Sequence, residues 1–439
     1  MKNVRKAAFE IVTKVLGGNG YSNLLLNQMI KSKEIDPVDV SLLTEIVYGT
    51  IQNKITLDYY LKDFIDMKKT KGWVKNILRI SLYQMHFLDK IPNHAILNEA
   101  VTLAKDRGGK NSGNFVNAVL RNISRKGLKS LDDIKDQTER LSIQTSHPRW
   151  LVSLWLEQYG LDTTTKLCNA NNSRPSIHCR LNLTKDDSNS LIKKLEDQEI
   201  EVSRHPFIEE GVKIIKGNII GTSLYTDGYL TIQDFSSMLV AKILDPSESD
   251  DVLDTCAAPG GKTTHIAELM SNSGSVSACD IYDHKIKLID EHVDRLGLKQ
   301  IKTYKQDARE LTKEFKAGTF DRVLIDAPCS GLGVIKRKPE IKYHKSRKDL
   351  SQIVKLQKEI IDDAVKLLKP GGRLVYSTCT INKRENEDIV NYILKNNSEL
   401  SLYSEPFKQF GLDSDGTLQI LDNDLGADLF FIACFRKQV

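Results

Sequence analysis

The sequence predicts a doubly wound α/β domain with a largely parallel sheet, preceded by an all-helical domain and a small α/β connector. Its 439 residues are enough for about three domains. Helical spacing of apolar residues dominates the first third of the chain, and strands alternate with helices from about residue 234 onward. An apolar content of 40% and a charged content of 28% are typical of folded proteins and exclude a disordered chain.

The helical domain is predicted over residues 1–140, because apolar residues recur there at three- and four-residue steps. The first helix ends at Gly17-Gly18, and further helices are expected at about 22–31, 39–52, 55–66, 73–88, 94–105 and 112–125. Residues 1–145 carry 23 Lys and Arg against 15 Asp and Glu, so the remainder of the chain has a net charge of −3. A basic helical domain on a near-neutral body is typical of a polyanion-binding appendage, although a chance surplus of lysine is the alternative.

Basic residues concentrate around a glycine-rich turn, AKDRGGKNSGNF, which is expected between the last two of these helices. Clustered cations beside backbone amides suit contacts with phosphate groups. The candidate phosphate-binding residues, expected near one end of the helical bundle, are Lys105, Arg107, Lys110, Arg121, Arg125 and Lys126.

The connector is predicted over residues 147–233, after a boundary at His147-Pro148. A helical unit, WLVSLWLEQYG, opens it. Short strand-like runs then surround a helix at 187–196, namely SIHCRLNL, EVSRHPF, GVKIIKG and GYLTIQD.

The α/β domain is predicted over residues 234–439, with strands at 252–256, 275–281, 301–307, 320–326 and 373–379. Helices are expected to about residue 271, at 283–296, at 347–368 before Pro370-Gly371-Gly372, and at 384–395. Such alternation is typical of parallel strands with helices on both faces of the sheet. Ligands in these folds bind outside the carboxyl ends of the strands. The candidate site residues are therefore those at the strand ends.

The first of these strands ends in a glycine-containing turn, DTCAAPGGKTT. Gly260 and Gly261 let the backbone approach a ligand closely, and the helix that follows favours an anionic group at its start. Cys256 stands where a phosphate-binding loop of the Walker A type has its first glycine, and the GxGxxG pattern is absent. A cofactor with a nucleoside and a carboxylate, but without phosphates, therefore fits better.

Two aspartates extend the predicted cofactor site. Asp280 ends the second strand, where a carboxylate can accept both ribose hydroxyls, and Asp307 ends the third, where it can accept the adenine amino group. Singly, each is better explained as a helix cap or a turn residue, but their order after a glycine turn indicates S-adenosylmethionine. Two roles are open for Lys262: it attracts a phosphate group or the substrate, or it only caps its own helix. The candidate cofactor-binding residues are Cys256, Ala257, Ala258, Pro259, Gly260, Gly261, Lys262, Asp280, Asp307 and Asp326.

Seven cysteines stand in the chain, an odd number without CxxC spacing, so neither a disulfide framework nor a zinc site is indicated. Two of them, Cys329 in DAPCSG and Cys379 in STCT, follow adjacent strand ends and should converge on one cleft. A single cysteine at such a position is most often buried packing. The pair, with Asp326 three residues before Cys329, indicates thiolate chemistry.

These motifs resemble those of the RNA cytosine-C5 methyltransferases, in DAPCSG, STCT and the cofactor turn CAAPGGKTTH. QDFSSMLVAKIL (233–244) is similar to the segment that leads into that family's catalytic domain, and RLNL (180–183) is similar to its RxN strand. The segment ILNEAVTLAKDRGGKNSGNFVNAVLRNI resembles the helical domain of the NusB antitermination factor. Together they resemble the RsmB (Sun/Fmu) family over essentially the whole chain. Thr380 and GADLFFIACF (426–435) depart from the family pattern, and the second leaves local substrate contacts in doubt.

The resemblance implies a Rossmann-like methyltransferase domain after a NusB-like RNA-binding domain. It implies methylation of C5 of a cytosine in small-subunit (16S) rRNA by S-adenosylmethionine. Cys379 would be the nucleophile toward C6, Cys329 would assist product release, and Asp326 would hydrogen-bond the base edge near N3. A cytoplasmic location is expected, because the amino terminus lacks a secretion signal and no run of 18 apolar residues spans a membrane. No metal is expected, and nothing in the sequence demands more than a monomer.

Three other functions remain open from the sequence. A DNA cytosine methyltransferase would take its nucleophile from the PC motif, at Cys329, but the NusB-like domain and the TC cysteine argue against it. A methyltransferase that acts on another RNA is the second. A non-catalytic RNA-binding or antitermination factor is the third, and it would be expected to have a broken catalytic site.

Overall fold

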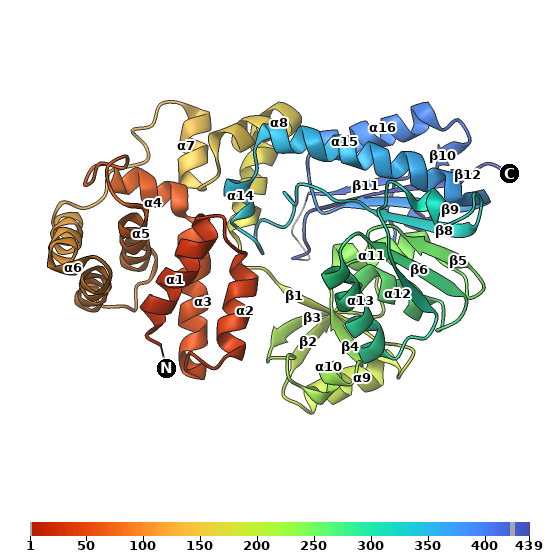
Figure 1. The fold of residues 1–439 in the computed structure, drawn as a ribbon, viewed down its shortest axis with the longest axis horizontal. Coiled ribbons are helices and arrows are strands. Elements are labelled where there is room, and N and C mark those ends of the chain that lie inside the picture. The colour runs from red at the N-terminus through yellow and green to blue at the C-terminus, as the bar shows by residue number, and fades with distance from the viewer. Residues whose placement is uncertain (1, 422–425) are drawn as a thin grey trace. The chain divides into compact units, whose positions relative to one another are not determined.

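The computed structural model describes residues 2–421 and 426–439 (Figure 1). The chain forms two compact units, one of Met1–Ser173 with Ile335–Lys345 and the other of Arg174–Val334 with Ser346–Val439. In the part of the chain that the structure describes, no helix is both long and apolar enough to cross a membrane.

The first unit is helical and packs around one apolar core. On its first helix, the apolar side chains that recur at three- and four-residue steps are buried, as the sequence predicts, and Phe9 is buried as well. The helices are α1 (Val4–Leu16), α2 (Ser22–Lys31), α3 (Val40–Gln52), α4 (Lys54–Leu61), α5 (Gly72–Phe87), α6 (Asn93–Lys126), α7 (Gln137–Gln144), α8 (Arg149–Asn172) and α14 (Ile341–His344). The sequence does not predict α7, whose polar stretch has no clear period. It places α8 in the connector, whereas in the structure α8 packs within the helical unit.

The last two predicted helices are the two arms of α6, joined at a sharp bend. Gly109 interrupts the helix with φ 75° and ψ −178°, a conformation that favours glycine. A Cβ atom on Gly113 would lie 2.4 Å from Cγ of Lys105. Residues eight apart are about 12 Å apart in a straight helix, so the arms fold back against one another. Figure 1 shows the two arms side by side, seen end-on.

Residues 335–345 follow the loop after a sheet strand, yet their side chains complete the helical unit. Glu340 is fully buried and accepts hydrogen bonds from the backbone N and Oγ of Ser22, at 3.0 and 2.8 Å, at the start of α2. The Lys342 ammonium donates to the Gln52 carbonyl at 2.9 Å, and burial lowers the pKa of Lys342 to about 7. His344 Nε2 lies 3.0 Å from the Val15 carbonyl oxygen. These polar groups are satisfied only when the segment is in place.

Replacement of Glu340 by alanine is expected to destabilise the helical unit by about 3 kcal/mol, because it leaves buried donors of Ser22 without an acceptor. Chemical denaturation of the full chain, followed by tryptophan fluorescence, measures the change, since Trp73, Trp150 and Trp155 all lie in this unit. Asp133→Ala, an exposed change in the same unit, is the control and is expected to shift stability by less than about 0.5 kcal/mol. Equal effects of the two changes would contradict the expectation.

The second unit begins with a small antiparallel sheet of order β2-β3-β1-β4. Its elements are β1 (Ile177–Leu181), α9 (Ser188–Glu196), β2 (Glu201–Arg204), β3 (Gly211–Lys216), α10 (Ser223–Thr226) and β4 (Leu230–Ile232). The four strand-like runs and the helix predicted for this region are therefore present.

The larger sheet has the order β10-β12-β9-β8-β5-β6-β7, and β11 pairs with β12. Its strands are β5 (Asp251–Asp254), β6 (Ser275–Asp280), β7 (Ile301–Lys305), β8 (Phe320–Asp326), β9 (Leu368–Thr378), β10 (Leu400–Leu402), β11 (Thr417–Ile420) and β12 (Phe430–Lys437). β5 to β9 pair in parallel, as predicted. β12 adds antiparallel to β9, and the sequence does not predict this extension.

Helices cover both faces of this sheet (Figure 1). On β8, Val323 and Ile325 face the core shared with α15 and α16, and Leu324 faces the core shared with α11, α12 and α13. The helices are α11 (Phe235–Leu244), α12 (Gly261–Leu269), α13 (Asp283–Leu296), α15 (Arg347–Ala364), α16 (Glu387–Asn396) and the short α17 (Glu405–Lys408). The predicted helix to residue 368 ends earlier, at Ala364, and Pro370-Gly371-Gly372 lies within β9. The register of β8 and β9 shifts there.

Candidate active site

The two predicted thiols lie together at the carboxyl edge of the sheet. Cys329 follows β8 and Cys379 follows β9, two parallel neighbours in which Asp326 is level with Ser377. The Cys329 and Cys379 sulfurs are 3.3 Å apart. The hydrogen bond between the thiols and burial raise the pKa of Cys329. The predicted convergence of the two cysteines is present in the structure.

Backbone hydrogen bonds link the loop that contains Cys329 to the loop that contains Cys379. The Gly333 amide donates to the Cys379 carbonyl at 2.9 Å, and the Leu429 amide donates to the Gly333 carbonyl at 3.2 Å. A Cβ on Gly333 would lie 2.0 Å from the Leu429 carbonyl oxygen. Only glycine therefore fits at position 333, where the backbone lies directly against the Leu429 carbonyl.

A buried carboxyl group that the sequence does not predict ties the same loops together. Glu385 is fully buried and accepts hydrogen bonds from the amide and hydroxyl of Ser330, at 2.8 and 2.7 Å, and from Asn382 at 2.9 Å. The Ser330 hydroxyl also lies 2.7 Å from that of Thr380. Burial raises the pKa of Glu385. In sequence, the surrounding NKREN is typical of a solvated turn, so no local signal marks this residue.

The Asp326 carboxylate is held on both oxygens. Lys262 Nζ donates to Oδ2 and the Ser377 hydroxyl donates to Oδ1, each at 2.8 Å. Burial alone would lower the pKa of Lys262, but the adjacent Asp326 carboxylate outweighs it and the pKa is raised. The Lys262 ammonium also lies 5.3 Å from the centre of the Phe430 ring. Lys262 is thus a cation paired with the predicted catalytic carboxylate.

The glycine turn after β5 has the open backbone that the sequence predicts. Gly260 has φ 103°, and a Cβ on Gly261 would meet no atom within 4 Å. The Gly260 amide donates to the Ala257 carbonyl, and the Ala257 amide donates to the Cys279 carbonyl on β6. The turn is therefore hydrogen-bonded to β6, and the space beside Gly261 is open.

A fully buried arginine of the small sheet supports this turn. Arg180 on β1 donates to the Gly261 carbonyl at 2.9 Å and to Gln233. It also donates to both carboxylate oxygens of Glu268, at 2.7 and 2.8 Å, and to Thr264 at 3.1 Å. The RLNL strand thereby fixes the start of α12.

Three aspartates lie at the strand ends beside the turn. Asp254 is fully buried and accepts from Thr263 at 2.7 Å, and its second oxygen has no hydrogen-bond partner among the residues that the structure describes. Burial raises the pKa of Asp254 to about 7. Asp280 is nearly buried and accepts long hydrogen bonds from the Tyr282 amide at 3.3 Å and from Lys285 at 3.4 Å. Asp307 pairs instead with Arg309 at 2.6 Å, which lowers the pKa of Asp307.

These features fit a cofactor with a nucleoside and an amino-acid part better than a nucleoside triphosphate. The lysine of the turn is paired with Asp326, whereas in a triphosphate site it would contact phosphate. Asp280 keeps acceptor capacity for hydroxyl groups. Within residues 2–421 and 426–439, no group of three or more His, Cys, Asp or Glu side chains could hold a metal ion.

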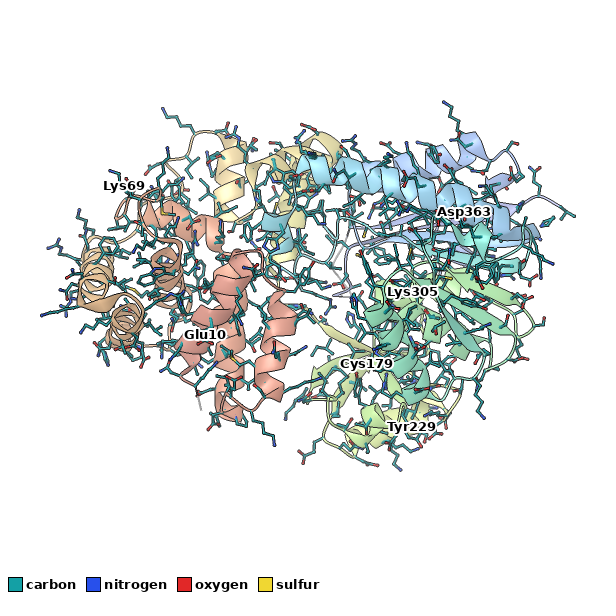
Figure 2. All side chains as sticks on the ribbon, viewed as in Figure 1. Glu10, Lys69, Cys179, Tyr229, Lys305 and Asp363 are labelled. Carbon is teal, nitrogen blue, oxygen red and sulfur yellow. The ribbon has the colours of Figure 1, made fainter. Side chains whose placement is uncertain are left out.

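The remaining cysteines have the character of packing residues. Cys179, labelled in Figure 2, is buried on β1, and burial raises its pKa to about 12. Burial likewise raises the pKa of Cys168 to about 11 and that of Cys434 to about 12. The thiols of Cys279 and of Cys256, the latter in the glycine turn, also have pKa values raised by burial. Cys168, Cys179, Cys279 and Cys434 are all buried, as is typical of cysteines that only fill a core.

The structure does not gather the six predicted phosphate-binding residues near one end of the bundle. Lys105 and Lys110 flank the bend of α6, and the Arg107 guanidinium lies over the rings of Phe9 and Trp73, at 5.3 and 5.9 Å from their centres. The other three, Arg121, Arg125 and Lys126, lie at the far end of the second arm. Lys110 and Arg125 are about 22 Å apart along that arm. The length of the second arm separates the two sets.

Three family models match successive parts of the chain. The NusB family matches residues 2–125, and the ferredoxin-like domain of RsmF/B-like methyltransferases matches residues 147–220. The model described as 16S rRNA methyltransferase RsmB/F matches residues 241–436.

Full-length relatives agree with these matches. The chain is 46% identical to the probable ribosomal RNA small subunit methyltransferase B of Bacillus subtilis, over 99% of each chain. It is 32% identical to the ribosomal RNA small subunit methyltransferase B of Vibrio vulnificus, over 99% of this chain and all of the relative. Among solved structures, the crystal structure of PH0851 is similar over the whole of both chains, with a TM-score of 0.84 and 27% identity.

Proposed function

The chain belongs to the 16S rRNA methyltransferase family RsmB/F, and on that premise we propose that it methylates C5 of a cytosine in small-subunit rRNA, with S-adenosylmethionine as methyl donor. The observation that carries the proposal is the 3.3 Å approach of the Cys329 and Cys379 sulfurs. These thiols lie at the same sheet edge as the Asp326–Lys262 pair. The Cys379 thiol can bond the base while the Cys329 thiol is available for product release.

The first step assigned to the protein is nucleophilic addition by Cys379. Cytosine C5 is too weak a nucleophile to take a methyl group unaided. When the Cys379 thiolate bonds to C6, the electron pair of the C5–C6 double bond makes C5 enamine-like. When bound, S-adenosylmethionine would supply an electrophilic methyl group on a sulfonium; the sulfur–methyl bond would break as C5 takes the methyl, and a neutral thioether would leave.

Asp326 is proposed to hydrogen-bond the base edge near N3, and its partner cation Lys262 offsets the negative charge that develops on the base as the thiolate adds. Lys262 and the Ser377 hydroxyl each hold one oxygen of Asp326, at 2.8 Å, so the carboxyl group is oriented before the base arrives. The target cytosine must be unstacked to reach this edge.

Product release is assigned to Cys329. After methylation, C5 still carries a proton, and the C6–sulfur bond to Cys379 must break. With the Cys329 thiolate as base, the C5 proton passes to that sulfur, the C5–C6 double bond re-forms, and the Cys379 thiolate leaves. Its position 3.3 Å from the Cys379 sulfur suits this role.

Mapping of 5-methylcytosine tests the proposed activity. Bisulfite sequencing of 16S rRNA from cells that lack this protein is expected to show the loss of one methylated cytosine, restored by the parental gene. An unchanged pattern of 5-methylcytosine would overturn the proposal, and a loss confined to another RNA would reassign the substrate.

Asp280 is proposed to bind the ribose of the cofactor, as predicted from its place at the end of β6. Asp280→Ala is expected to raise the Kd for S-adenosylmethionine by about 30-fold, because two hydrogen bonds to a charged acceptor are lost. Isothermal titration of the full chain measures this change. Asp283→Ala is the control, since Asp283 is exposed and pairs with Lys305. A Kd for Asp280→Ala within twofold of the parental value would refute the assignment.

A further inference from the structure

The two arms of α6 form a polar groove at the end opposite the Gly109 bend. Its volume is about 700 Å³. The start of the first arm contributes Asn93, His94 and Asn98, and the end of the second arm contributes Asn117, Arg121 and Arg125. Among the described residues that line it, none is acidic.

Both arginines of this groove are oriented by asparagines on the same arm. Asn117 Oδ1 accepts from Nε of Arg121 at 3.1 Å, and Asn122 Oδ1 accepts from Nη2 of Arg125 at 3.3 Å. These partners are neutral, so the positive charges are not compensated. Within the part of the chain that the structure describes, neither guanidinium has a carboxylate partner, unlike Arg149, which pairs with Asp136 and Glu139. Two oriented guanidinium groups without a compensating negative charge, in one groove, indicate that the groove binds an anionic ligand.

The amides indicate which anion the groove suits. Each asparagine side chain offers hydrogen-bond donors and an acceptor, and the neutral imidazole of His94 offers one donor nitrogen and one acceptor nitrogen. A ribose 2′-hydroxyl is likewise both donor and acceptor, and lies beside the phosphates of RNA. Guanidinium, amide and imidazole groups together therefore suit the sugar–phosphate backbone of RNA better than an isolated inorganic anion.

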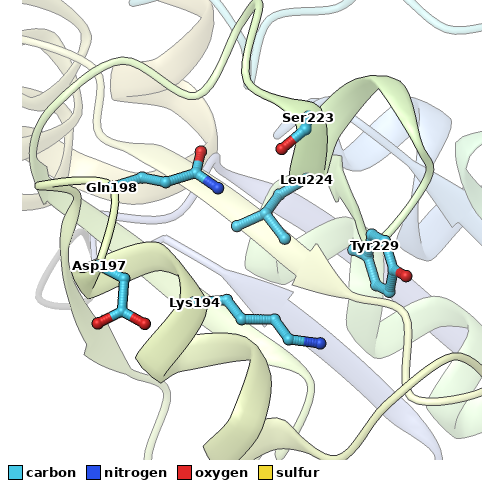
Figure 3. Close-up of a pocket in the computed structure, with 6 residues that line it drawn as sticks. All are labelled: Lys194, Asp197, Gln198, Ser223, Leu224 and Tyr229. Atoms are coloured by element: carbon cyan, nitrogen blue, oxygen red, sulfur yellow. The ribbon is translucent and has the colours of Figure 1, made fainter.

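A smaller hollow, with a volume of about 320 Å³, lacks this chemistry. It lies in the small sheet region and is lined by Lys194, Asp197, Gln198, Ser223, Leu224 and Tyr229 (Figure 3). Its lysine is paired with Asp186 at 2.5 Å, and Asp197 adds a negative charge. That hollow has no surplus of positive charge for a polyanion.

We propose that the groove between the two arms of α6 binds the sugar–phosphate backbone of the substrate rRNA, with Arg121 and Arg125 on phosphates and Asn93, His94 and Asn98 along the riboses. This inference rests on the proposed function. In it, the groove is the part of the helical unit that contacts the rRNA. The residues at the bend of α6 lie outside it.

The test is binding of transcribed 16S rRNA to the full chain at several KCl concentrations. The double variant Arg121→Gln/Arg125→Gln is expected to raise Kd about tenfold and to reduce the slope of log K against log salt by about 1.5. Lys62→Gln/Lys68→Gln removes the same charge from exposed lysines of the same unit and is expected to change Kd less than twofold. Asn98→Ala, which changes no charge, is expected to raise Kd about threefold with an unchanged slope.

Parental affinity in the arginine double variant, or an equal loss in the lysine double variant, would overturn the groove assignment. Circular dichroism verifies that each variant is folded. Methyl transfer separates this result from a failure of the proposed function. If the groove assignment holds, the arginine variant raises KM for 16S rRNA and keeps kcat. If the proposed function is wrong, the parental protein itself forms no 5-methylcytosine in 16S rRNA.

Discussion

Methyl transfer by the Cys379→Ala variant is expected to be slower than that of the parental protein by about 10⁴-fold or more. Without the thiolate, C6 gains no bond and C5 does not become enamine-like. The rate of transfer from labelled S-adenosylmethionine to 16S rRNA measures the effect. Because Cys379 is proposed to act only on the bound base, Kd values for the cofactor and for the RNA should stay within about threefold of the parental values.

Cys434→Ala is the control for this experiment, since Cys434 is a buried thiol of β12 with no proposed role in the chemistry. It is expected to keep the parental rate at a temperature where the variant is folded. A Cys379→Ala rate within tenfold of the parental rate would exclude Cys379 as the nucleophile.

Arg180→Met is expected to destabilise the second unit by about 3–5 kcal/mol, the largest stability effect predicted for this chain. The change leaves the Glu268 carboxylate without its guanidinium and the Gly261 carbonyl without its donor. Hydrogen–deuterium exchange of β1 and α12, with the midpoint of urea unfolding, measures the loss. The same variant should bind S-adenosylmethionine more weakly, because the glycine turn loses its support.

A double-mutant cycle with Glu268 separates the ion pair from the loss of packing. Arg180→Met/Glu268→Leu should be more stable than Arg180→Met alone, since no unpaired buried charge remains. Arg180→Lys is the conservative control and should fall between the parental protein and Arg180→Met. A loss below about 1 kcal/mol for Arg180→Met would contradict the account of the turn.

Much of the catalytic half could be predicted because parallel strands end at one edge of a sheet. The predicted site residues Asp280, Asp307, Asp326 and Cys379 each lie at or just after a strand end that alternation locates in the sequence. The predicted order of a NusB-like region, a connector and a Rossmann-like methyltransferase region is confirmed.

The features that could not be predicted depend on contacts between distant parts of the chain. Ser22 and Glu340 are 318 residues apart, and no local pattern links them. Glu385 follows an ordinary polar turn, and only the folded loops show that it is buried among Ser330 and Asn382. The turn predicted between the last two helices is present at Gly109, but the helix that follows it is long enough to carry Arg121, Arg125 and Lys126 about 22 Å away from the basic residues at the bend.

Trapping of a covalent enzyme–RNA complex tests the central claim most directly, namely that Cys379 bonds the base and Cys329 releases it. Each cysteine is replaced by alanine in turn, and the full chain is incubated with 16S rRNA and S-adenosylmethionine before denaturing electrophoresis. The account predicts a denaturation-resistant complex with Cys329→Ala, because addition and methylation proceed but release does not, and none with Cys379→Ala. A complex with Cys379→Ala and none with Cys329→Ala would contradict it.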